Sequence, residues 1–506
     1  MKRLMSLVMI VLLILSSLMP VNTRAEEEKR TLESEIVYNI FVDRFNNGDA
    51  KRHEQVDIND ELAYHGGDIK GIEMRLDVLQ NMGFTTLVLS PIMENAKKGY
   101  HGYWVEDFYS IDNQFGDEKA LKKLIKAAHK RDMKIVLELV TNYSADSFLE
   151  KEKKAKEDWF KENDVLPIEA NEWLNDSLTF NQENKEVKDY LFNVAEYWMD
   201  TYDIDGYKLH AADQANQEFL EELTSKIKEK NKDFYLLAGL LQDDIESDTS
   251  ALKSNENIDA VENVKMFETL NSVFQESDKS PTEIFDVWKE TERTNDILYV
   301  DNINTARFSN NFADHGRNSI TAWSLALTTM YTTPGVPVIY QGSETPMYGP
   351  GYPENRYMVD STSSDQDLEK VFEKLGTIRD NFPALVNGSY EFVTSNEGLT
   401  LFKRADKDQT LYVAINNDTK SRVVTIDDLT DDFQLNGLMQ DHIVRAGTDG
   451  KFEVGLPRET AEIFILEENK GFNWVFIGFV ASVFIFFIYF VNRLTRLQKK
   501  RETGSK

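Results

Sequence analysis

The chain has 506 residues, of which 41% are hydrophobic and 11% aromatic, enough to build a large core and more than one domain. Its formal net charge of −30 argues against nucleic acid as a partner, because the phosphates would be repelled. Cysteine is absent, which excludes disulfides, zinc–thiolate sites and thiol chemistry.

Two apolar stretches lie near the ends of the sequence. Residues 1–25 combine a basic start, an apolar middle and a small-residue cleavage site, which predicts a signal peptide; an uncleaved N-terminal anchor is the alternative. Residues 474–491 are almost wholly apolar and predict a transmembrane helix. The basic residues in 492–506 then predict a cytoplasmic tail, a single-pass protein in the cell membrane and an extracellular ectodomain.

Between these stretches, apolar runs typical of β-strands alternate with segments typical of helices. Seven strands are predicted, with a weaker eighth at 260–266, and they span residues 35–43, 85–90, 134–140, 207–210, 234–240, 297–302 and 336–341. Helices are predicted at 72–82, at 118–129 and from about residue 211. Such alternation is typical of parallel βαβ units.

Two further segments depart from this alternation. The Lys/Glu-rich run 150–164 predicts a solvated helix rather than a binding tract. From residue 388, short alternating strands predict an antiparallel β-domain at 388–467. Its expected strands are 390–393, 399–403, 410–416, 423–426 and 461–466.

The stretch DGYKLH, residues 205–210, carries the strongest functional signal. Tyr207 and Leu209 are apolar strand residues, whereas His210 is polar and directly precedes the next predicted helix. An α/β barrel presents such strand-end side chains at its active face. His210 is therefore a candidate functional residue.

Several further motifs follow one another along the chain. They are YNIFVDRFNNGD at 38–49, YHGGDIKG at 64–71, GYHGYWVEDFYSIDNQFG at 99–116, GVPVIYQGSE at 335–344, PENR at 353–356 and FPAL at 382–385. With DGYKLH, this series resembles the α-amylase family, glycoside hydrolase family 13, over roughly residues 30–465. The resemblance implies an α/β fold: an eight-stranded TIM-type (β/α) barrel at 30–387, with the insertion 143–179, and a C-terminal antiparallel β-domain at 388–467.

The resemblance also locates the family's catalytic positions. The nucleophile, the acid/base and the third acid correspond to His210, Leu240 and Asn304. The family's arginine and two histidines correspond to Lys208, Ile303 and Tyr143, and its aspartate after the third strand to Glu138. Retaining hydrolysis needs a carboxylate nucleophile and a protonated acid. The sequence therefore predicts a non-catalytic member, with His210 as a hydrogen-bonded residue at the barrel mouth.

An active α-amylase or α-glucosidase with displaced acids is the alternative. Its candidates are Asp213, one helical turn after His210, and Asp243 and Asp244, beyond the fifth strand. Each also fits a plain role, because Asp213 suits a helix start and the other two suit a polar loop. Loss of catalytic residues costs many orders of magnitude in rate, which favours the non-catalytic interpretation.

Part of the family's sugar site is retained. The resemblance implies substrate-binding residues at His101, Tyr103, Trp104, Asn142 and Asn302. An aromatic face can stack on a sugar ring, and a histidine can bond a hydroxyl; simple packing of the loop is the alternative. The expected partner is an α-glucan bound weakly, or a membrane or cell-surface protein.

Calcium is common in the family, and one of its sites matches in part. The matching positions are Asn47, Asp49, Gly66 and Asp68, which supply hard oxygen ligands. Two further ligand positions fall on Arg52 and His53, and a second family site loses an aspartate at Thr179. Ordinary turn residues are the alternative, and no organic cofactor is implied.

Overall fold

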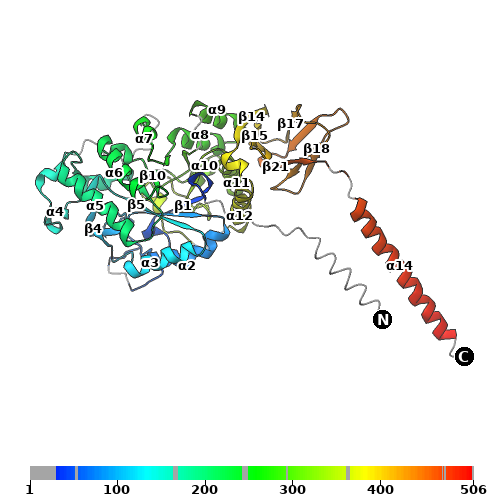
Figure 1. Cartoon of the computed structure of the whole chain (residues 1–506), viewed down its shortest axis with the longest axis horizontal. Coiled ribbons are helices and arrows are strands. Elements are labelled where there is room, and N and C mark those ends of the chain that lie inside the picture. Colours follow the sequence, from blue (N-terminus) through cyan, green and yellow to red (C-terminus); the bar gives the residue numbers. More distant parts are fainter. Residues whose placement is uncertain are drawn as a thin grey trace.

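The computed structural model describes residues 30–51, 55–162, 169–241, 249–291, 295–360, 365–469, 471 and 474–503 (Figure 1). The predicted signal peptide, the positions Arg52 and His53, and Asp243 and Asp244 lie outside the described residues.

Eight parallel strands form the central barrel. They are β1 (Val37–Ile40), β2 (Thr86–Leu89), β5 (Lys134–Leu139), β9 (Gly206–Leu209), β10 (Tyr235–Ala238), β11 (Ala260–Val261), β12 (Ile297–Leu298) and β13 (Val336–Tyr340). Their order is β11-β10-β9-β5-β2-β1-β13-β12, and a parallel bridge between Glu262 and Ile297 closes the ring. The predicted eight-stranded barrel is confirmed.

The strand predicted at 260–266 is shorter in the structure, where it is β11. It ends at Val261, because the Asn263 side chain accepts the amide of Met266 and starts α8 (Val264–Gln275). The helix predicted from residue 211 also starts later. Ala211 has a left-handed φ of 50°, a 3-10 turn η5 (Ala212–Gln214) follows, and α6 (Gln217–Lys230) begins only after the Asn216 cap.

Helices cover the outside of the barrel, and side-chain caps set several of their starts. Asp68 caps α2 (Ile69–Asn81), and Asp117 caps α3 (Glu118–His129), the helix predicted at 118–129. The remaining elements of this layer are η1 (Leu32–Ser34), η2 (Val42–Arg44), α5 (Lys185–Thr201), α7 (Ser250–Ser254), α9 (Thr282–Thr291), α10 (Phe308–Asp314), α11 (Ser319–Thr332), η6 (Glu354–Arg356), α12 (Gln366–Asn381) and α13 (Ala384–Asn387).

The insertion after the third strand is a small sheet. It contains β6 (Tyr143–Ala145), α4 (Phe148–Lys151), η3 (Glu157–Trp159), β7 (Phe160–Lys161), η4 (Glu169–Asp176) and β8 (Ser177–Phe180), with strand order β6-β8-β7. The run 150–164 is not one helix over the residues described there, although most of its side chains are exposed, as predicted. Trp159 is buried, and the Phe160 ring stacks on Phe180 at 5.3 Å, so this run folds onto the sheet. A hairpin of β3 (Met93–Asn95) and β4 (Val105–Ile111) lies before it in the chain.

The C-terminal domain is antiparallel, as predicted. Its strands are β14 (Ser389–Asn396), β15 (Leu399–Ala405), β16 (Thr410–Asn416), β17 (Arg422–Ile426), β18 (Phe433–Gly437), β19 (Ile443–Arg445), β20 (Phe452–Leu456) and β21 (Thr460–Glu468). Six of them form one sheet, β14-β15-β16-β21-β18-β19, and β17 pairs with β20. The strands β18, β19 and β20 were not predicted.

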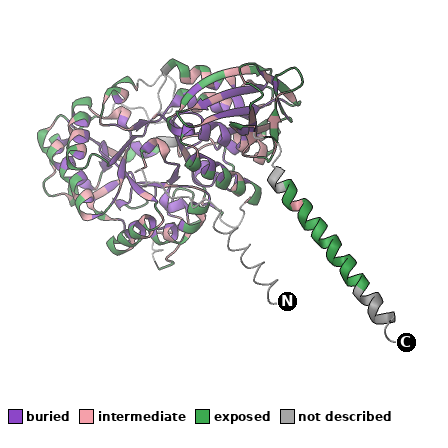
Figure 2. Ribbon diagram, turned by 45° about the vertical axis from the view of Figure 1, so that its right-hand side comes forward, coloured by how far each residue is buried: buried purple, intermediate pink, exposed green. Residues whose placement is uncertain are grey.

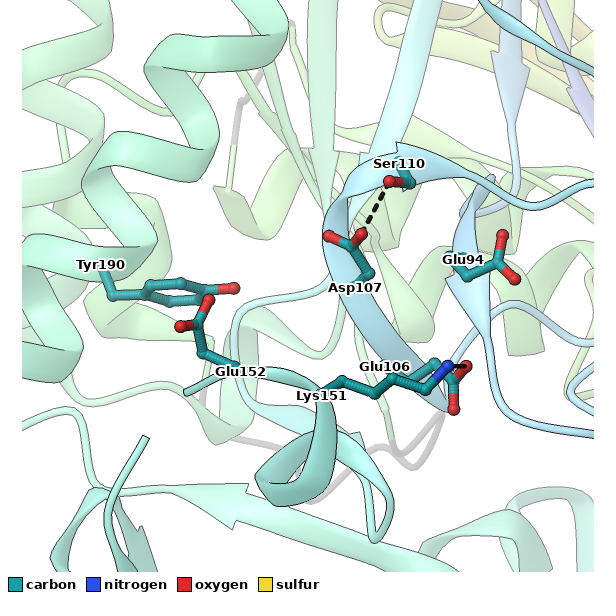
Figure 3. A pocket seen from close by; sticks show the side chains of 7 residues that line it. All are labelled: Glu94, Glu106, Asp107, Ser110, Lys151, Glu152 and Tyr190. Atoms are coloured by element: carbon teal, nitrogen blue, oxygen red, sulfur yellow. Dashed lines mark hydrogen bonds and ion pairs between the residues drawn. The ribbon is translucent and has the colours of Figure 1, made fainter. Parts of the chain in front are cut away.

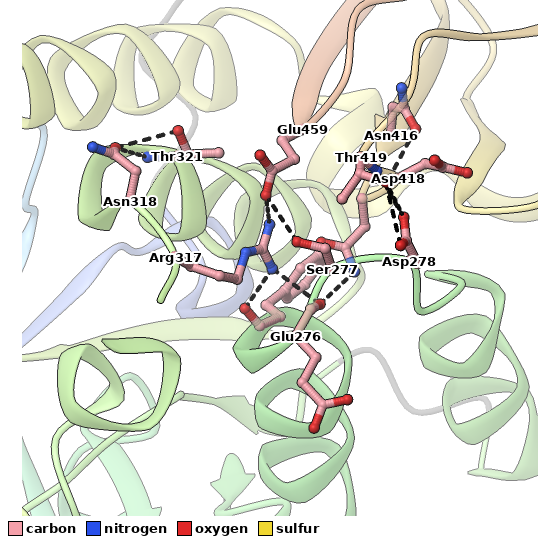
Figure 4. A network of polar contacts seen from close by, with 12 residues as sticks. Glu276, Ser277, Asp278, Arg317, Asn318, Thr321, Asn416, Asp418, Thr419 and Glu459 are labelled. Atoms are coloured by element: carbon pink, nitrogen blue, oxygen red, sulfur yellow. Dashed lines mark hydrogen bonds and ion pairs between the residues drawn. The ribbon is translucent and has the colours of Figure 1, made fainter. Parts of the chain in front are cut away.

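Polar contacts join this domain to the barrel (Figure 4). Arg317 donates to the carbonyl of Phe274 at 2.7 Å and to Glu459 at 3.0 Å. Asn417 donates to the carbonyl of Val273 at 2.8 Å. Both side chains therefore satisfy carbonyls at the end of α8, which otherwise have no helical partner.

One helix extends away from the two domains. Helix α14 (Trp474–Thr503) contains the segment Ile477–Arg496, which is long and apolar enough to cross a membrane and packs against nothing in the structure (Figure 2). It is the single such helix among the described residues. Length and composition alone support this property.

Candidate functional site

The barrel interior changes from apolar to charged along its axis. Val37, Val136 and Val336 belong to a buried cluster inside the barrel. Near the carboxyl ends of the strands, which form the barrel mouth, Glu138 on β5 lies opposite Lys208 on β9 in the parallel register. Strand-end side chains of such a barrel meet at this mouth.

A buried ion pair crosses the mouth. The Nζ atom of Lys208 lies 2.9 Å from Oε1 of Glu262, and Oε2 of the same carboxylate accepts the amide of Leu240 at 2.9 Å. Gly239 makes room for this contact, because a Cβ there would lie 2.5 Å from Cε of Lys208. Glu262 is thus held beside position 240.

A second buried pair lies next to it. Nδ1 of His210 is 2.7 Å from Oε1 of Glu138, and the Tyr103 hydroxyl approaches the same oxygen at 3.5 Å. Burial alone would raise the pKa of Glu138, but the hydrogen bond from His210 and the charge of Lys208 lower it below its usual value. Glu138 is therefore an ionised acceptor.

Aromatic rings close the mouth above these pairs. The Tyr103 ring stacks on His210 with centroids 4.2 Å apart, and His101 stacks with Tyr103 at 5.5 Å. Trp173, from η4, contacts Tyr103 at 4.7 Å and Tyr143 at 5.4 Å. All five side chains are buried, with exposed fractions of 7% or less. The face of Tyr103 is therefore covered by protein.

The asparagines expected to bind sugar hold the backbone. Asn142 donates to the carbonyl of Ala211 at 2.7 Å and accepts from Gln182 at 2.7 Å. Asn302 accepts the amide of Asn304 at 2.7 Å. These contacts occupy groups that a sugar hydroxyl would need, and sugar binding by the two residues stays a prediction.

Family models match both domains. The model of the α-amylase catalytic domain matches residues 39–385, and the model of the α-amylase C-terminal domain matches residues 388–464. The chain belongs to the α-amylase family.

Similar proteins of known structure or name support the assignment to this family. The structure is similar to an α-amylase of Anoxybacillus (TM-score 0.82, 37% identity, 88% of this chain and 100% of that one). It is also similar to the α-amylase of Geobacillus thermoleovorans solved with acarbose (TM-score 0.80, 34% identity, 87% and 100%). A Bacillus cyclomaltodextrinase is 29% identical over 76% of this chain and 72% of its own. The Paenibacillus polymyxa beta/alpha-amylase is 27% identical over 85% of this chain, which spans 37% of that relative.

In this α-amylase-family barrel, Asp213 is the one displaced-acid candidate within the described residues. Its Oδ1 accepts the amide of Leu241 at 2.8 Å, and its Oδ2 accepts the amide group of Gln214 at 2.6 Å. Burial raises its pKa above the usual value. Asp213 thus ties the ends of β9 and β10 together.

The sequence did not single out Glu262 or Trp173. Glu262 lay inside the strand predicted at 260–266, and only the observed end of β11 at Val261 shows that it is a strand-end residue. Trp173 lies in the insertion, where no family motif marks it. Only the folded insertion shows that this residue reaches the mouth.

The predicted calcium ligands include a helix cap. The Asp68 carboxylate accepts the amides of Gly71 at 2.6 Å, Asp49 at 2.6 Å and Gly48 at 3.1 Å. Over the described parts of the chain, no group of three or more acidic or histidine side chains is placed to hold a metal. These amides occupy carboxylate oxygens that a calcium ion would need, and calcium binding at this loop stays a prediction.

Proposed function

We propose that this protein is a non-catalytic, membrane-anchored member of the α-amylase family that binds α-glucan weakly on the outside of the cell. The observation that carries the proposal is the state of the barrel mouth. His210, Leu240 and Asn304 occupy the family's three carboxylate positions, and the nearby carboxylates are committed to other partners.

The chemistry of hydrolysis supports this assignment. A retaining enzyme needs a nucleophilic carboxylate and a proton donor about 5–5.5 Å apart. Leu240 has no proton to give, and Glu138 is kept ionised by His210 and Lys208, so it is a poor acid. Glu262 is ion-paired with Lys208, which opposes its use as a nucleophile.

Retained aromatic residues support α-glucan as the ligand. His101, Tyr103 and Trp104 lie at the mouth, and the similar Geobacillus α-amylase was solved with acarbose. Catalytic carboxylates mainly serve the transition state, so their loss affects turnover more than ground-state binding. We expect a dissociation constant of about 1 mM, or roughly −4 kcal/mol.

The relatives give a second candidate function. Their names denote starch- and cyclodextrin-degrading enzymes, which favours an active hydrolase if Asp213 supplies a proton. In that case the half-buried Asp213 would have to leave the amide of Leu241 and reach the substrate. The non-catalytic proposal requires no such rearrangement.

Calorimetric titration of the full-length protein in detergent with maltoheptaose tests the proposal. We expect weak binding, reduced by Tyr103→Ala, and chromatography should recover the sugar intact. If Tyr103→Ala does not change the affinity for maltoheptaose, the sugar binds at a different site. No binding at high sugar concentration would favour a protein partner instead.

A further inference from the structure

The side chain of Trp173 lies at the centre of the aromatic cluster that closes the mouth. Its ring centroid is 4.7 Å from Tyr103, 5.4 Å from Tyr143, 5.7 Å from His210 and 5.9 Å from His101. His101 and Tyr103 come from the loop between β3 and β4, and His210 follows β9, whereas Tyr143 on β6 and Trp173 on η4 belong to the insertion. One indole ring therefore connects the insertion to the barrel mouth.

Few polar contacts hold this ring in place. The carbonyl of Trp173 accepts the indole N–H of Trp104 at 2.8 Å and the hydroxyl of Ser177 at 3.0 Å. Both contacts act on the backbone, and the indole itself is held by packing. Its segment, η4, is a 3-10 helix, whose hydrogen-bond geometry is poorer than that of an α-helix.

The closed arrangement leaves polar groups unsatisfied. Nε1 of Trp173, Nε2 of His101 and Nε2 of His210 have no hydrogen-bond partner among the described residues, and each side chain is more than nine-tenths buried. Nδ1 of His101 accepts the amide of Tyr103 at 3.0 Å, which places the proton of a neutral ring on Nε2. Buried donors without partners cost free energy. The cluster is therefore packed well but bonded poorly.

We propose that Trp173 is a displaceable plug that packs over Tyr103 beside His210 and blocks the place where a glucose ring would bind. This inference rests on the proposed α-glucan binding. A pyranose ring offers an apolar face to Tyr103, as the indole does, and adds hydroxyls that can bond the free nitrogens of His101 and His210. Sugar entry requires the plug to leave, which reduces the apparent affinity by the fraction of closed molecules.

Two substitutions at one position separate the plug from the rest of the site. Trp173→Ala removes the ring, whereas Trp173→Phe keeps an aromatic cover. In titrations of the full-length protein in detergent with maltoheptaose, we expect Trp173→Ala to bind about tenfold more tightly than wild type. Trp173→Phe should remain within about twofold of wild type. Equal affinities for all three proteins would overturn the plug.

A second measurement does not depend on sugar. Diethyl pyrocarbonate modifies accessible imidazoles, and peptide mass spectrometry resolves the site. We expect faster modification of His101 and His210 in Trp173→Ala than in wild type and Trp173→Phe. If the imidazoles of Trp173→Ala react faster but neither Trp173→Ala nor wild type binds sugar, Trp173 covers the mouth as proposed and α-glucan is not the ligand. Unchanged modification in a folded Trp173→Ala variant would reject the plug.

A milder variant covers the case in which Trp173→Ala does not fold. Ser177→Ala removes the hydroxyl that holds the carbonyl of Trp173 and leaves His101, Tyr103 and Trp104 unchanged. It should raise the affinity for maltoheptaose and the modification of His101 in the same direction. No change in either readout would count against the plug.

Discussion

Nδ1 of His210 lies 2.7 Å from a carboxylate oxygen of Glu138, at the position where the family carries its nucleophile. An aspartate at 210 would place a second carboxylate beside Glu138, and like charges that close raise a pKa strongly. The histidine instead provides a donor that keeps Glu138 ionised. In the non-catalytic protein that we propose, His210 would therefore stabilise the barrel mouth instead of attacking a substrate.

Breaking the buried pair between Lys208 and Glu262 should destabilise the fold. Lys208→Met leaves the Glu262 carboxylate buried without its cation, and we expect a loss of about 3–5 kcal/mol in denaturant unfolding. Lys370→Met is the matched control, because both side chains of its pair with Asp367 are largely exposed and the pair should contribute less than about 1 kcal/mol. Similar small losses for both variants would contradict a role for the buried pair.

Restoring the family's catalytic residues should not be sufficient for activity. The five changes are His210→Asp, Leu240→Glu, Asn304→Asp, Lys208→Arg and Ile303→His. A carboxylate at 240 would lie near Glu262, and the plug would still close the mouth. We expect measurable release of nitrophenol from nitrophenyl α-maltosides only when Glu262→Gln and Trp173→Ala are added. Activity from the five changes alone would show that the mouth is already open.

The stability of the protein should depend on Glu94 between pH 4.5 and 8. Glu94, Glu106 and Asp107 surround a pocket of about 400 Å³, where Lys151 pairs with Glu106 at 2.9 Å (Figure 3). Burial, with the charges of Asp112 and Glu106, raises the pKa of Glu94 from 4.5 to about 7. A raised folded-state pKa favours folding below the unfolded value of 4.5, and this contribution is lost as the pH rises through 7.

Replacing this carboxyl removes the effect. Glu94→Gln should be more stable than wild type by about 1 kcal/mol at pH 8, once solvent screening of the half-buried group is allowed for, and no more stable at pH 4. Thermal melts at the two pH values measure this difference. A stabilisation that is the same at both pH values would show that Glu94 does not titrate as described.

Removing divalent cations should leave the melting temperature unchanged. Three backbone amides already donate hydrogen bonds to the Asp68 carboxylate and satisfy it without a metal ion. We expect EDTA followed by added calcium to shift the melting temperature by less than about 1 °C, since a ligand that binds only the folded state would raise it. A calcium-dependent rise abolished by Asp49→Asn would restore the predicted metal site.

Family motifs predicted the barrel and the place of His210, because a strand-end residue keeps its position whatever its side chain. They did not predict that Lys208 pairs with Glu262, since the two residues are brought together by the closure of the sheet around β10. They also missed Trp173. The run 150–164 was predicted to be helical from its charges, but burial of Trp159 decided its fold instead.

Turnover of maltoheptaose by the wild-type, full-length protein tests the central claim most directly. Chromatographic separation of the products detects single cleavage events per protein molecule over long incubations. Our account predicts no cleavage above that of a variant carrying Asp213→Asn and Glu262→Gln. Sustained release of shorter maltooligosaccharides by wild type, abolished in that variant, would contradict it and identify an active hydrolase with displaced acids.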